Sequence, residues 1–74
     1  MDVCYVISLV SVSEKHGPRL DAVLRVKRNL DDAIEYVAHN TNVPASAIKK
    51  RWSNGFVNVY LNDSIYTIEE NALE

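Results

Sequence analysis

The stretch FVNVYLNDSIYTIE, Phe56 to Glu69, decides the fold because two strand-like runs flank a good two-residue turn, Asn62-Asp63. Directly opposed residues of a β-hairpin share one face of the sheet. With this turn, one face is largely apolar and carries the pairs Leu61–Ser64, Val59–Tyr66 and Val57–Ile68. The other, more polar face carries the pairs Tyr60–Ile65, Asn58–Thr67 and Phe56–Glu69. The register is self-consistent. It leaves the large side chains of Phe56, Tyr60 and Ile65 on the polar face, where an isolated hairpin would expose them.

A helix is predicted upstream of this hairpin. Asn29 can cap its first turn, where the negative charges of Asp31, Asp32 and Glu35 suit the positive end of the helix dipole. Apolar residues then recur at the spacing of one buried helical face, at Leu30, Ala33, Ile34, Val37 and Ala38.

A second, shorter helix is predicted from Pro44 to about Trp52. Proline suits the first position of a helix, and Asn54-Gly55 can end it. Its inward residues are expected to be Ala47, Ile48 and Trp52.

Two strands are predicted at the start of the chain. The run from Val3 to Val12 has apolar residues at both its odd-numbered and its even-numbered positions, which is typical of a central strand. After a break at residues 13–19, LDAVLRVK alternates, which places Leu20, Ala22, Leu24 and Val26 inward and Asp21, Arg25 and Lys27 outward. We therefore expect one α+β domain over residues 1–74, with a small antiparallel sheet of about four strands, two helices on one of its faces, and the order β-β-α-α-β-β.

The composition is that of an ordinary globular domain, with 47% hydrophobic and 24% charged residues and a net charge of −2. The longest apolar run is far shorter than the roughly 20 residues of a membrane helix, and no Lys or Arg precedes it as in a signal peptide. We expect a cytoplasmic protein without a membrane partner. Cys4, the one cysteine, is expected to be a small buried hydrophobe.

The sequence offers little for catalysis. His16 is expected in a loop and His39 on the outer face of the first helix, and neither has a further ligand at metal-binding spacing. Gly17 and Gly55, the only glycines, do not make a phosphate-binding loop. We expect no enzymatic activity, catalytic residue, metal, cofactor or small-molecule substrate.

The segment from His39 to Gly55 is also typical of a helix-turn-helix DNA reader. Asn42 stands where the turn needs positive φ, and Lys49 and Lys50 project outward from helix 44–52. The hairpin that follows would be the wing of a winged helix. Against this interpretation, the first helix is acidic and strands stand where a third helix is expected. The alternative, two packed helices with a solvated basic face, is favoured, and DNA binding stays open.

Six of the eight basic residues fall in two short segments, and the aromatic residues Phe56 and Tyr60, with Tyr36 as a further candidate, are surplus to the core. Together they suit a protein-binding surface with an aromatic centre and a charged rim, although ordinary solvated side chains would give the same pattern. The candidate partner-binding residues are Arg25, Lys27, Arg28, Lys49, Lys50, Arg51, Phe56 and Tyr60.

At LRVKRNLDDAIEYVAHNTNVPA the chain resembles small bacteriophage-encoded regulators that bind host RNA polymerase. The resemblance covers about a third of the chain and is carried by Leu30, Asp31, Asp32, Ala33, Ile34 and Glu35, with the Val43-Pro44 exit. It implies a non-enzymatic regulator in the host bacterial cytoplasm that binds RNA polymerase or a transcription factor, to inhibit or antiterminate transcription. No binding residue is carried over from the family. A winged-helix regulator is the alternative, and a virion structural protein, which would form stable homo-oligomers, is a third hypothesis.

Overall fold

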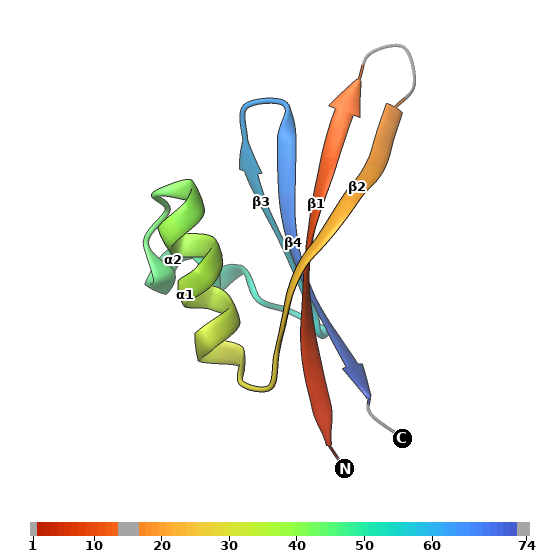
Figure 1. The fold of residues 1–74 in the computed structure, drawn as a ribbon. Helices are drawn as coiled ribbons and strands as arrows, with labels where there is room; N and C mark the ends of the chain where they lie inside the picture. Colours follow the sequence, from red (N-terminus) through yellow and green to blue (C-terminus); the bar gives the residue numbers. More distant parts are fainter. Residues whose placement is uncertain (1, 14–16, 73–74) are drawn as a thin grey trace.

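The structure is a computed structural model that describes residues 2–13 and 17–72 (Figure 1). Its elements, in chain order, are β1 (Val3–Ser13), β2 (Gly17–Lys27), α1 (Leu30–Thr41), α2 (Ala45–Arg51), β3 (Phe56–Leu61) and β4 (Ser64–Ala72). The expected α+β class and the order β-β-α-α-β-β are confirmed.

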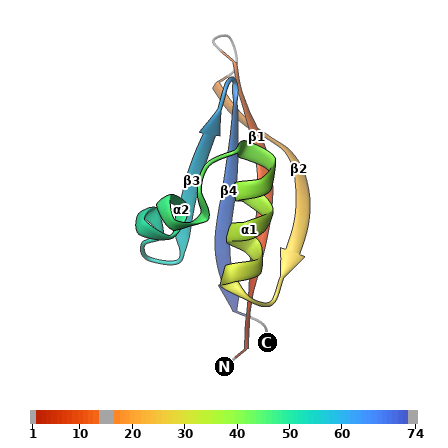
Figure 2. The same cartoon turned by 90° about the vertical axis from the view of Figure 1, so that its left-hand side faces the viewer.

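The four strands form one antiparallel sheet in the order β2-β1-β4-β3. β1 is central, as its two-sided apolar pattern predicts, and it pairs with β4 from Val3–Ala72 to Ser11–Ser64. Both helices lie on the same side of the sheet, with α1 over its middle and α2 beside α1, against β3 (Figure 2). We call the side under the helices the covered face and the opposite side the open face.

The register of the β3–β4 hairpin is the predicted one in all six pairs, from Leu61–Ser64 to Phe56–Glu69. Asn62 adopts a positive φ of 55°, which a two-residue hairpin turn favours and which Asn tolerates. The turn therefore fixes which side chains of both strands face the helices.

The core fills the space between the helices and the covered face. β1, β3 and β4 contribute side chains from the covered face, and each helix contributes its apolar side. The fully or almost fully buried residues are Ile7, Ala33, Ile34, Val37, Ile48, Val57, Val59 and Ile68. Cys4 is also buried and its thiol is free, as expected.

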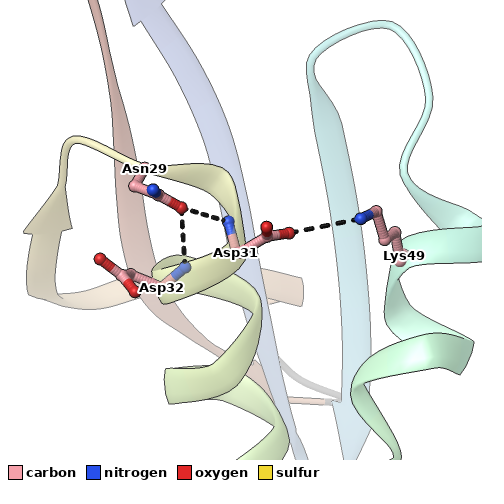
Figure 3. A network of polar contacts seen from close by, with 4 residues as sticks. All are labelled: Asn29, Asp31, Asp32 and Lys49. Carbon is pink, nitrogen blue, oxygen red and sulfur yellow. Dashed lines mark hydrogen bonds and ion pairs between the residues drawn. The ribbon is translucent and has the colours of Figure 1, made fainter.

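The ends of the helices follow the sequence closely. Asn29 Oδ1 accepts hydrogen bonds from the backbone N–H groups of Asp31 and Asp32, at 2.8 and 3.2 Å (Figure 3). α1 ends at Asn42, whose φ is 59°, the positive value that the sequence predicted for the turn. Pro44 has an extended ψ of 137°, so α2 begins one residue later than expected.

The prediction for β2 is wrong about which side chains face the core. Of the four residues placed inward, only Leu24 packs against the core, while Leu20 and Val26 are exposed on the open face. The register between β1 and β2 shifts twice, between Ile7 and Ser8 and again before Val10. Each shift inserts an extra residue into β2, and such bulges defeat strict alternation.

Arg25 and Lys27 lie on the covered side, where they pair with Ile7 and Tyr5. They were expected on the outer face of the strand. The loop prediction for residues 13–19 is also corrected, since β2 begins at Gly17. His16 lies outside the described residues, and His39 is exposed near the end of α1, as predicted.

Candidate interaction surfaces

The candidate partner-binding residues do not form one surface. The basic residues of β2 and α2 lie on the side of the helices, whereas Phe56 and Tyr60 lie on the open face. The expected arrangement, an aromatic centre surrounded by those charges, is therefore replaced by two separate surfaces.

The first surface contains a cluster of two cations and one aromatic ring, which we call the Tyr36 cluster. The guanidinium carbon of Arg25 lies 5.7 Å from the ring centroid of Tyr36, and Lys27 Nζ lies 5.9 Å from it. Both distances suit cation–π attraction. Arg25 Nη1 also donates a hydrogen bond of 2.7 Å to the carbonyl of Leu24, which holds one edge of the guanidinium and leaves the group exposed.

The basic residues of α2 form a second group. Lys49 Nζ lies 3.4 Å from Asp31 Oδ1, and both side chains are exposed (Figure 3). An ion pair of this kind contributes little to stability. Lys50 and Arg51 are exposed in the last turn of the helix. α1 lies between α2 and β2 (Figure 2), and Arg28 is exposed just beyond β2.

The second surface is the open face of the sheet. The strand pairings align its side chains in three rows that cross all four strands. Two rows are mostly apolar, and the row between them holds smaller polar groups. In order from β2 to β3, the rows are Val26, Val6, Glu69 and Phe56; Val23, Ser8, Thr67 and Asn58; and Leu20, Val10, Ile65 and Tyr60.

All the large hydrophobic residues that the structure describes as exposed belong to this open face. They are Val12, Leu20, Val23, Val26, Phe56 and Tyr60. The sequence predicted the exposure of the two aromatic residues, because the hairpin register places them on the face that is not apolar. The prediction missed the aliphatic residues of β2, since alternation alone does not show which face of a strand the helices cover.

Asn58 is a polar residue at the β3 end of the middle row. Its Oδ1 is covered and has no hydrogen-bond partner within the described part of the chain. A covered acceptor without a partner loses its water without compensation, which costs stability. Among the described residues, the open face thus contains one covered polar atom without a partner, in the row between its two apolar rows.

An aromatic contact closes one end of the covered face. The rings of Tyr5 and Trp52 meet edge to face, with centroids 5.9 Å apart. Desolvation by burial, together with the charge of Glu70 and a hydrogen bond to its carboxylate, raises the pKa of Tyr5 above its usual value of about 10. Tyr5 therefore favours its neutral hydroxyl in the folded protein.

Other kinds of site are not found in residues 2–13 and 17–72. No group of three or more His, Cys, Asp or Glu side chains in these ranges could hold a metal ion, and no pocket is detected. No described helix is long and apolar enough to cross a membrane. Comparison of the chain with protein-family models, curated proteins and solved structures gives no match.

Proposed function

We propose that this chain is a small non-catalytic regulatory protein that acts by binding an acidic surface of another protein. The resemblance in its first helix suggests the host transcription machinery as the target, RNA polymerase or a transcription factor. Binding would occlude or bridge a functional surface of that target, and so inhibit or antiterminate transcription.

The observation that carries this proposal is the Tyr36 cluster. Arg25 and Lys27 bring two positive charges to one ring, and neither has a carboxylate partner within 4 Å among the described residues. A carboxylate from outside that approaches this ring would be attracted by both charges. Arg can hold such a carboxylate with two parallel hydrogen bonds, and Arg and Tyr are among the residues that dominate binding energy at protein interfaces.

The surroundings of the cluster favour a protein over a nucleic acid. Asp31, Asp32 and Glu35 are exposed on α1, the helix that carries Tyr36, and Lys49 is already paired with the first of them. A phosphate backbone that lay across the helices would meet this negative charge. A folded acidic partner can instead place one or two carboxylates at the cluster and keep its other charges away from α1.

Affinity capture with purified variants tests the proposal. The wild-type chain, Arg25→Glu and the control Arg19→Glu are immobilised and exposed to nuclease-treated bacterial lysate, and the retained proteins are identified by mass spectrometry. Arg19 is exposed on the same strand and gives the same change of charge away from Tyr36. We expect the wild type and Arg19→Glu to retain polymerase subunits or a transcription factor in stoichiometric amounts. Arg25→Glu should retain at least tenfold less of the same proteins.

Equal retention by all three chains would remove the Tyr36 cluster as the binding site. Empty columns, or retention of proteins unrelated to transcription, would remove the proposed target. A run-off transcription assay with the purified target then decides between inhibition and antitermination.

The second candidate is a winged-helix DNA binder, and one observation favours it: Lys50 and Arg51 are exposed on α2 after the Asn42 turn. The fold supports it less well. α1 and α2 rest on a sheet, α2 has seven residues, and the hairpin expected as a wing pairs with β1 inside the sheet. If it is correct, Lys49→Ala and Lys50→Ala will each lower DNA affinity and flatten its dependence on salt. An unchanged salt slope would exclude it.

A further inference from the structure

The open face presents an apolar patch as large as the largest patches that typical monomers expose. Its six exposed hydrophobic residues leave between 41% and 65% of their surface uncovered. Together these side chains present on the order of 600 Å², the upper end of the largest patches on typical monomers. By contrast, Glu69 is the only charged residue with a described side chain that the strand register places on this face.

The edges of the sheet are poorer docking sites than its face. β2 contains two bulges, which interrupt the regular row of backbone groups that another strand would need. β3 has only six residues, from Phe56 to Leu61. A partner of this sheet therefore gains most by covering the open face.

The face is suited to packing against itself. Its large apolar rows flank a middle row with the small side chains of Ser8 and Thr67, so large residues of one sheet can lie over small residues of another. Two copies would bury roughly 1,200 Å² in total, the lower limit for specific and stable interfaces. The face has almost no charge that would select an oppositely charged partner, and a net charge of −2 opposes self-association only weakly.

We infer that a second copy of this chain covers the open face, and that the protein is a homodimer in which two sheets pack face to face. A two-fold axis makes this contact symmetric, so that the same patch of both copies is buried. Glu69 lies in the row nearest the chain ends and takes a place at the rim of the interface. Both helix layers, each with its Tyr36 cluster, remain on the outside.

Sedimentation equilibrium of the full chain from 1 to 500 µM tests this inference. We expect the wild type to be a dimer with a dissociation constant of about 1–10 µM, because the interface lies at the lower limit of size for stable complexes. Val23→Glu places a carboxylate in the middle row and should raise that constant roughly a hundredfold, with an unchanged circular dichroism spectrum. Val23 is 56% exposed, so the monomer tolerates the change.

Adjacent Ala22 provides the matched control. It is exposed on the same strand but pairs with Leu9 on the covered side of the sheet, so Ala22→Glu should leave the dimer intact. Tyr60→Lys, on the opposite edge strand, should dissociate the dimer as Val23→Glu does. If both variants dissociate the dimer, a local distortion of β2 by Val23→Glu cannot be the cause.

A wild-type chain that is monomeric throughout this range overturns the inference, whatever else then covers the open face. Equal weakening by Ala22→Glu and Val23→Glu overturns the choice of face. Arg25→Glu should not change the association state. Dimer formation and the proposed binding at the Tyr36 cluster can therefore fail separately.

Discussion

The covered and open faces of one sheet are built from the same four strands and differ in what lies on them. On β3, Val59 is fully buried under the helices, while its neighbour Tyr60 is 65% exposed on the opposite side. Both are large residues that favour strands. The chain thus has apolar side chains for two faces and helices for only one. The comparison teaches that burial here is decided by the supply of covering elements rather than by hydrophobicity.

The largest expected effect breaks the covered face. Ile68 is fully buried and pairs with Ile7 and Val57 on its two sides, so Ile68→Ala leaves a cavity in the core. We expect a loss of about 3–4 kcal/mol in the free energy of unfolding. Urea denaturation measures it, in the Val23→Glu background so that self-association does not add to stability.

Val26→Ala is the control on the open face. Val26 is 57% exposed, and its truncation in the same background should change the free energy of unfolding by about 0.5 kcal/mol or less. A loss comparable to that of Ile68→Ala would mean that the open face is packed within the monomer.

A smaller effect is expected at Asn58, on the open face. Asn58→Thr removes the covered, unpaired Oδ1 and introduces a residue that favours strands. We expect the free energy of unfolding to rise by about 1 kcal/mol in the Val23→Glu background. Thermal unfolding checks this, and a decrease would show that the Asn58 side chain is hydrogen-bonded in solution.

The smallest effect concerns pH at the end of the covered face. The pKa of Tyr5 is raised, so between about pH 10 and that higher value the unfolded chain has lost a proton that the folded protein keeps. The free energy of unfolding must then fall as pH rises through this window. Tyr5→Phe should make the fall less steep, whereas Tyr60→Phe, on the open face, should not. Denaturant titrations from pH 9 to 11.5 compare the slopes, and equal slopes for both variants would contradict the role of Tyr5.

The sequence predicted those parts of the molecule that local chemistry determines. The turn at Asn62-Asp63 sets the whole hairpin register, and Asn29 and Asn42 set the two ends of α1. β2 was misread because its pairing with β1 decides both which of its sides the helices cover and where its two bulges fall, and its own alternation reveals neither. For the same reason the Tyr36 cluster was not predicted as a unit, although its two cations were selected as candidates and Tyr36 was considered as a further surplus aromatic residue. Their meeting with a helical ring depends on tertiary structure.

The position of the two chain ends has a kinetic consequence. β1 and β2 form one local hairpin, and β3 and β4 form another, but the sheet is completed only when Val3 pairs with Ala72 (Figure 1). That pairing closes a loop of nearly the whole chain, so its entropy cost must be met before its contacts give any return. We therefore expect docking of the two hairpins to be the slow step of folding. Until it occurs, the inner edges of β1 and β4 are unpaired, and this is the interval in which the chain is most exposed to aggregation.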